Sequence, residues 1–125
     1  MIVGLGIDFL EVHPFERELA RAPWLPQDGV FTRREIRRCS RGPRPHQRYA
    51  TCFAAKEATL KALCLVPRDL GQFREVEMAR GPNHEDIIVL HRRLKQESRR
   101  LGVRRIRLAT ASTRSHSAAM VILEA

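Results

Sequence analysis

Aromatic residues are scarce in this chain of 125 residues, where one tryptophan, one tyrosine and five phenylalanines make up only 6%. No apolar run reaches the length of about 20 residues that a membrane-spanning helix needs. The chain has three cysteines, Cys39, Cys52 and Cys64, an odd number without metal-ligand spacing. Its first residues, Met1-Ile2-Val3-Gly4, contain no basic leader. These absences lead us to expect a reduced cytoplasmic protein without a membrane segment or a zinc site.

Acidic residues are also in the minority, with 14 Asp and Glu against 23 Lys and Arg and a net charge of +9. Such a surface favours acidic partners and polyanionic ligands, including nucleic acid. The chain has no zinc-finger spacing, recognition-helix signature or aromatic-interleaved basic strand, which argues against nucleic acid. Its arginine pairs are scattered along the chain, as expected of solvated faces.

The hydrophobic pattern predicts a single domain, residues 1–125, of the α+β class. We expect strands over residues 1–12, 73–78, 87–90, 106–111 and 118–124. We expect helices over residues 14–21, over 46–65, and from about 91 to Leu101–Gly102, with a loop over 22–29.

Two features refine this prediction. Thr32, followed by Glu35 three residues later, predicts a capping box that begins a further helix, and this role alone is assigned to the pair. The long helix 46–65 is expected to have Tyr49, Phe53 and Leu60 on or near its buried side, and Pro67 is expected to terminate it. Cys52 and Cys64 flank the apolar segment Phe53–Ala62 of this helix and are predicted to be small buried residues.

The centre of that helix reads Phe53-Ala54-Ala55-Lys56-Glu57-Ala58-Thr59-Leu60-Lys61-Ala62. Helical spacing places Glu57 and Lys61 on one face, one turn after Phe53. The alanines allow another backbone or a ligand to come close, a carboxylate can hold a hard cation, and a lysine can meet phosphate. The alternative is that Glu57 and Lys61 form an ordinary surface pair, which contributes only about 0.2–0.5 kcal/mol.

The first strand contains a charge: Asp8 lies between Ile7 and Phe9, shortly after Gly4 and Gly6. Burying a carboxylate inside a strand is costly unless it is paired or binds a metal. Asp8 is therefore a candidate metal ligand. The alternative is that it ends the strand and caps the following helix.

Taken together, these segments resemble the holo-acyl-carrier-protein synthases, which are small single-domain 4'-phosphopantetheinyl transferases. The resemblance rests on Gly6-Ile7-Asp8-x-x-Glu11, on Phe31-Thr32-x-x-Glu35 and on Phe53-Ala54-Ala55-Lys56-Glu57-Ala58-x-x-Lys61-Ala62. It runs nearly end to end and implies that family's fold, an antiparallel sheet packed with a long central helix.

The resemblance implies an enzyme that transfers the phosphopantetheine arm of coenzyme A to a serine of an acidic apo acyl carrier protein. It identifies Asp8 and Glu57 as ligands of Mg²⁺ and, with Lys61, as catalytic residues. Lys61, Phe53 and Ser112 would bind coenzyme A, and Arg17 with Arg21 would bind the carrier protein, although these arginines could simply face water. The resemblance also implies a homotrimer and a role in fatty acid or polyketide biosynthesis.

The sequence departs from the family pattern on the coenzyme A side. Cys52 stands where the family usually has arginine, and Ala62–Pro67 lacks the glycines of a phosphate-binding turn. Ser112 occupies the position of the family histidine, and Arg80-Gly81-Pro82 replaces the usual Gly-x-Pro turn. A divergent transferase is our main hypothesis, and a non-catalytic homologue that binds a carrier protein or a biosynthetic enzyme is the alternative.

Overall fold

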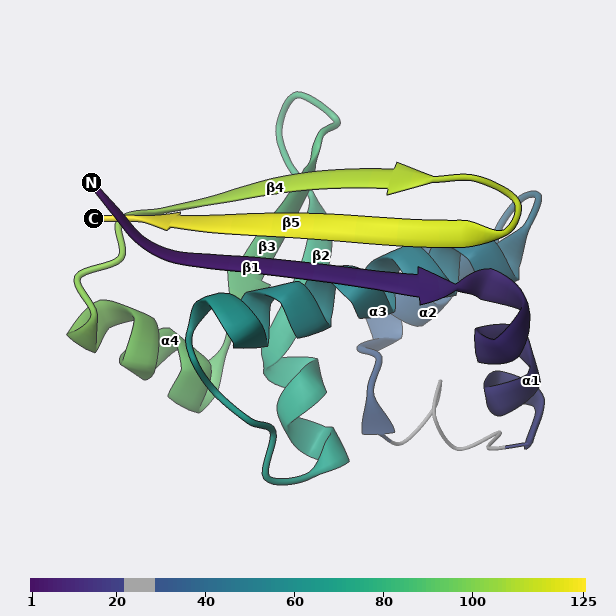
Figure 1. The fold of residues 1–125 in the computed structure, drawn as a ribbon, viewed down its shortest axis with the longest axis horizontal. Helices are drawn as coiled ribbons and strands as arrows, with labels where there is room; N and C mark the ends of the chain where they lie inside the picture. The colour runs from purple at the N-terminus through teal and green to yellow at the C-terminus, as the bar shows by residue number, and fades with distance from the viewer. Residues whose placement is uncertain (22–28) are drawn as a thin grey trace.

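The computed structural model describes residues 1–21 and 29–125, so nearly all of the predicted loop 22–29 lies outside the described residues. The described part contains two antiparallel sheets (Figure 1). The first has the order β1-β5-β4, and the second pairs β2 with β3. The strands are β1 Ile2–Glu11, β2 Val76–Arg80, β3 Asp86–Leu90, β4 Arg105–Ser112 and β5 His116–Glu124. The α-helices are α1 Val12–Arg21, α2 Arg33–Ser40, α3 Pro45–Ala62 and α4 Arg92–Arg100.

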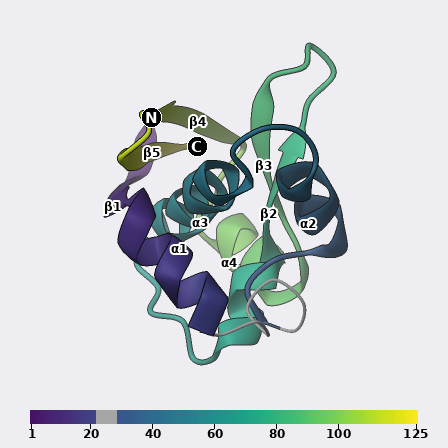
Figure 2. The ribbon, with the colours of Figure 1, turned by 90° about the vertical axis from the view of Figure 1, so that its right-hand side faces the viewer.

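The predicted α+β class and central helix are confirmed, with the strands divided between two sheets. Helix α3 lies between the three-stranded sheet on one side and the two-stranded sheet with α2 on the other (Figure 2). Its alanines Ala50, Ala54, Ala55 and Ala58 are fully buried. A helix with small side chains on several faces can approach elements on more than one side, and this places α3 at the core.

Glycines let β1 lie directly on the backbone of α3. A Cβ atom added to Gly6 would lie 1.8 Å from the carbonyl oxygen of Ala58, and one added to Gly4 would lie 2.3 Å from that of Ala62. No side chain fits at either position without separating strand from helix. This close approach brings Asp8, two residues after Gly6, to the surface of α3.

Both ends of α3 differ from the sequence prediction. The helix begins with Pro45, whose missing N–H costs nothing in the first turn. It ends at Ala62, well before Pro67, because Leu65 N donates to Leu60 O and Cys64 N donates to Lys61 O. Cys64 adopts the left-handed conformation of this ending, with φ 57°, without being a glycine. Cys64 is exposed, so its predicted burial is wrong, whereas Cys52 is fully buried as predicted.

The predicted strand 73–78 is wrong in its first half. Leu70–Glu75 form a 3-10 helix whose N-cap, Asp69, accepts a hydrogen bond from Gln72 N, and β2 begins only at Val76. The carbonyl oxygen of Phe73 accepts from the buried ammonium of Lys56 and not from a neighbouring strand. Local turns and a tertiary contact therefore both stabilise this segment.

The three-stranded sheet has one face against α3 and one bare face. On β1 the residues that point away from α3 are apolar and exposed: Leu5, Ile7 and Phe9 are 56%, 57% and 64% exposed. They pair across to Ile122, Met120 and Ala118 of β5. No described element covers this outer face (Figure 2).

Among the described residues, no helix has the length and apolarity to cross a membrane.

Candidate active site

A hollow of about 660 Å³ opens where β1 runs into α1, beside the middle of α3. It is lined by five of the residues predicted from sequence: Asp8, Phe53, Glu57, Arg17 and Arg21. These residues come from three separate elements, β1, α1 and α3. The fold therefore brings together residues from segments that are far apart in the sequence.

Asp8 is held at the base of this hollow. It lies inside β1, paired with Ala119 of β5, so it does not cap the following helix. The residue is only 8% exposed, and its Oδ1 accepts a hydrogen bond of 2.8 Å from Lys61 Nζ. Lys61 also donates to the carbonyl oxygen of Ile7 at 3.3 Å. Glu57 and Lys61 are thus not an isolated surface pair, because Asp8 interacts with both of them.

Glu57 shares this charge environment and is partly buried. Burial, the negative charge of Asp8 and a hydrogen bond with Asp8 raise the pKa of Glu57 from 4.5 to about 7, against the opposing effect of Lys61. Two carboxylates that face each other at low exposure favour either a shared proton or a bound cation. A carboxyl group with a pKa near 7 is also suited to accept a proton at neutral pH.

Phe53 forms the aromatic wall of the hollow. Its ring lies 5.3 Å from that of Phe15 on α1 and 5.4 Å from that of Phe73, centroid to centroid. Arg17 and Arg21, four residues apart on α1, are exposed at the rim. The hollow therefore combines the acidic pair and an apolar wall with two exposed arginines that an acidic surface could meet, and two exposed glutamates, Glu11 and Glu18, also line it.

Ser112 is the one predicted site residue that the fold keeps apart from this group. It lies at the end of β4 and accepts a hydrogen bond of 3.0 Å from Gln47 Nε2. It lines a different hollow, together with Arg38, Arg44, Arg48 and Arg80. Within one chain, Ser112 does not line the hollow that contains Asp8 and Glu57.

Comparison with known proteins shows which family this chain belongs to. The model of the 4'-phosphopantetheinyl transferase superfamily matches residues 4–120. The chain belongs to this superfamily. A holo-[acyl-carrier-protein] synthase of Koribacter versatilis is 34% identical over 124 residues, which cover 99% of both chains.

Solved structures show the same fold. The holo-[acyl-carrier-protein] synthase of Neisseria meningitidis superposes with a TM-score of 0.88 at 22% identity, covering 100% of both chains. That of Helicobacter pylori, solved in complex with coenzyme A, gives a TM-score of 0.78 at 19% identity over 96% of this chain and 99% of the other. The predicted enzyme class, a 4'-phosphopantetheinyl transferase of the holo-acyl-carrier-protein synthase type, is confirmed.

The acidic pair of this transferase fits a magnesium ion. No group of three or more His, Cys, Asp or Glu side chains that could hold a metal occurs in residues 1–21 and 29–125. Mg²⁺ is usually held by one or two carboxylates, with substrate phosphates and water completing its shell. Asp8 and Glu57 provide such a pair, and the ammonium of Lys61 already lies where positive charge is favoured.

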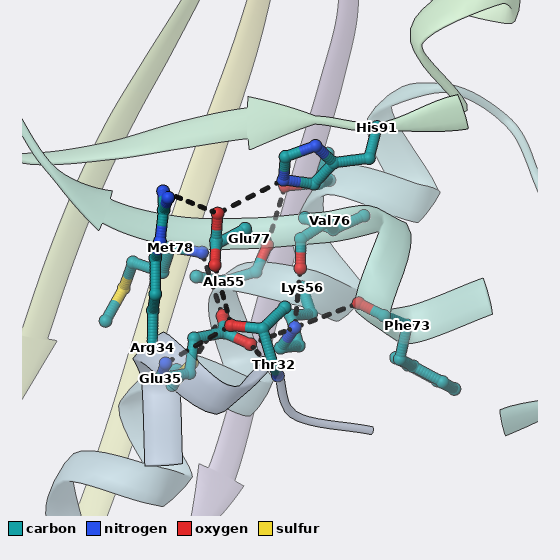
Figure 3. Close-up of polar contacts among 12 residues, drawn as sticks. Thr32, Arg34, Glu35, Ala55, Lys56, Phe73, Val76, Glu77, Met78 and His91 are labelled. Atoms are coloured by element: carbon teal, nitrogen blue, oxygen red, sulfur yellow. Dashed lines mark hydrogen bonds and ion pairs between the residues drawn. The ribbon is translucent and has the colours of Figure 1, made fainter. Parts of the chain in front are cut away.

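Sequence reasoning missed two buried charges beside this site. Lys56 of α3 and Glu35 of α2 form an ion pair of 2.6 Å between Nζ and Oε1, with both side chains 0% exposed (Figure 3). The capping box of Thr32 with Glu35 is present as predicted, but it describes only part of the role of Glu35. Helical spacing could have indicated that Lys56 is buried, because it places Lys56 on the same face of the helix as the apolar residues Cys52 and Leu60.

Proposed function

We propose that this transferase moves the 4'-phosphopantetheine arm of coenzyme A to a serine of an apo acyl carrier protein, with the help of Mg²⁺. The serine oxygen forms a bond to the phosphorus that carries the pantetheine arm. The bond from that phosphorus to the oxygen of 3',5'-adenosine bisphosphate breaks, and the serine proton leaves. The family comparison and the coenzyme A complex of the Helicobacter pylori relative support this choice of substrate.

The observation that carries the proposal is that Asp8 and Glu57 line one hollow and that Lys61 donates to Asp8 beside it. Asp8 and Glu57 would hold magnesium, which supplies positive charge against the phosphates. Lys61 would donate to a phosphate oxygen, and Glu57 would accept the serine proton directly or through a water molecule. Phosphoryl transfer depends mainly on positioning and charge neutralisation, which this group can provide.

Intact-protein mass spectrometry tests the proposal. Several apo acyl carrier proteins are incubated with the protein, magnesium and coenzyme A, with Asp8→Ala in parallel. We expect one carrier to gain the mass of one phosphopantetheine arm with the natural protein and no gain with the variant. A folded protein that binds a carrier but transfers nothing would favour the non-catalytic homologue, in line with the separate position of Ser112.

The effect of magnesium on stability should depend on pH. Because the pKa of Glu57 is raised from 4.5 to about 7 on folding, this group favours the folded state below pH 4.5, and that contribution is lost as the pH rises through 7. Magnesium binds the ionised pair, so it should raise the melting temperature more at pH 8 than at pH 6. Thermal unfolding with and without magnesium measures this, and Glu57→Gln should remove the difference.

Carrier binding should depend on the two exposed arginines at the rim of the hollow. We expect Arg17→Glu with Arg21→Glu to lower kcat/KM for the carrier protein by about tenfold or more, while the KM for coenzyme A changes little. Steady-state kinetics with each substrate varied in turn measures both values. Arg99→Glu with Arg100→Glu makes the same charge change on α4, and an equal loss there would attribute the effect to net charge alone.

We further propose that the bare face of the three-stranded sheet associates with two other copies of this chain. Leu5, Ile7 and Phe9 form an apolar surface on β1 that extends across β5, which is typical of a buried interface between identical subunits. A neighbouring subunit could then bring its own β4, and with it Ser112, toward the hollow. This arrangement would reconcile the predicted role of Ser112 with its position within one chain.

Sedimentation velocity at low concentration tests the trimer. The natural protein should sediment as three chains, and Leu5→Lys should sediment as one chain because its ammonium would have to be buried in the interface. Leu101→Lys, an equivalent change at a residue 49% exposed after α4, should stay trimeric. A natural protein that sediments as a single chain would contradict the proposal.

We place the reaction in the cytoplasm, as part of fatty acid or polyketide biosynthesis. All three cysteines are free thiols, which suits a reducing compartment. Cell fractionation checks the compartment, and the identity of the carrier that gains mass identifies the pathway.

A further inference from the structure

The ion pair between Lys56 and Glu35 lies outside the hollow and is completely buried. Moving two charges out of water costs several kcal/mol per ion, and a well-packed apolar pair would often be equally stable. Stability alone therefore gives little reason for this pair. Its contacts indicate what else it does.

Lys56 uses all three of its N–H donors. Besides Glu35 Oε1, its Nζ donates to the carbonyl oxygens of Phe73 at 2.9 Å and of Val76 at 2.5 Å (Figure 3). These carbonyls belong to the 3-10 helix and to the first residue of β2. The ammonium therefore has one position in which all of its bonds are made.

Glu35 is equally fixed. Its Oε1 accepts from Thr32 N at 2.8 Å, and its Oε2 accepts from Met78 N at 2.8 Å and from the Cys52 thiol at 3.1 Å. The pair thus joins α2, α3, the 3-10 helix and β2 at one point. Cys52, at the position where the family usually has arginine, is part of this buried network.

The network lies immediately behind the acidic pair. Lys56 and Glu57 are consecutive in α3, so their side chains leave the helix about 100° apart. When Lys56 is anchored to β2 and the 3-10 helix, Glu57 is turned toward Asp8 on β1. The ring of Phe53, one turn earlier, stacks on Phe73, whose carbonyl Lys56 holds.

We propose that Lys56, together with Glu35, is a positioning residue that sets the rotation of α3 so that Glu57 faces Asp8 in the geometry a divalent cation requires. Lys56 touches neither the cation nor the substrates. The identity of the cation, Mg²⁺, rests on the proposed function, while the geometric claim concerns the two carboxylates themselves.

The double variant Glu35→Gln with Lys56→Met separates positioning from stability. It removes both charges together, keeps side chains of similar length, and leaves an amide oxygen for Met78 N. We expect the melting temperature to stay within about 5 °C of the natural protein. We expect affinity for Mn²⁺, measured by calorimetry on the protein alone, to fall about 10- to 100-fold. In the transfer assay, kcat should fall by a similar factor while the KM for coenzyme A changes less than about threefold.

A matched control replaces the exposed ion pair of α4, with Glu97→Gln and Arg100→Gln, and should leave affinity and kcat unchanged. If the double variant fails to fold, Lys56→Arg serves instead, because its larger planar group keeps the charge but cannot make the same three bonds. A folded double variant with natural Mn²⁺ affinity and kcat would overturn the inference. A natural protein that binds Mn²⁺ but transfers nothing would contradict the proposed function, and the affinities would still decide the role of Lys56.

Discussion

Transfer should be abolished by Glu57→Gln, even when magnesium is in large excess. Glutamine has the shape of glutamate but carries no charge and accepts no proton at neutral pH. Glu57 is the group whose pKa is raised to about 7 beside Asp8, so the variant removes both half of the metal-binding pair and the proposed proton acceptor. We expect the rate to fall by about 10³-fold or more.

Initial rates of carrier modification over a series of magnesium concentrations measure this effect. Glu97→Gln makes the same chemical change on α4 and should behave as the natural protein. If high magnesium restores transfer to Glu57→Gln, the role of Glu57 is confined to metal binding. The proton of the serine must then pass to another acceptor.

A second large effect should follow from a single methyl group. Gly6→Ala places a Cβ atom 1.8 Å from the carbonyl oxygen of Ala58 and 2.7 Å from the amide nitrogen of Ala62. Both atoms belong to the backbone of α3, so neither can rotate away as a side chain would. We expect a loss of more than about 3 kcal/mol in the free energy of unfolding, measured by chemical denaturation.

Gly71→Ala provides the matched control for this change. Its added Cβ atom would meet only the end of the Asp69 side chain, at 3.0 Å, and Arg74 at 3.7 Å. We expect it to change stability by less than about 1 kcal/mol. A Gly6→Ala protein as stable as this control would mean that β1 can move away from α3. In that case Asp8 would be held less rigidly than the structure indicates.

The elements with a clear hydrophobic period could be predicted from sequence, and so could most of the site. The long helix, the first strand and the final hairpin lie within a few residues of their predicted positions. Asp8, Phe53, Glu57, Arg17 and Arg21 line one hollow, and the roles that the resemblance implies for them stay predictions. Local spacing and residue type carry enough information for the individual elements because each depends on its own segment, whereas the meeting of three elements in one hollow is not a local property.

The remaining features depend on contacts between distant segments. The 3-10 helix before β2 begins at a local cap, Asp69, and is also held by the bond between Lys56 and the Phe73 carbonyl, which no local pattern encodes. Glu35 was recognised only as part of a capping box because its partners are Lys56, Cys52 and Met78, all more than 15 residues away. Cys64 takes the left-handed position at the end of α3, which residue preference assigns to glycine.

The chain has three lysines, Lys56, Lys61 and Lys95, which differ sharply in their accessibility to a reagent in solution. Lys95 is exposed on α4, while Lys56 is sealed in the core with every donor occupied. Lys61 lies between these extremes, with its side chain 54% exposed and its ammonium bonded to Asp8. An amine-directed acylating reagent should therefore modify Lys95 quickly and leave Lys56 untouched. The rate at Lys61, relative to Lys95, then serves as a chemical footprint of whatever occupies the hollow.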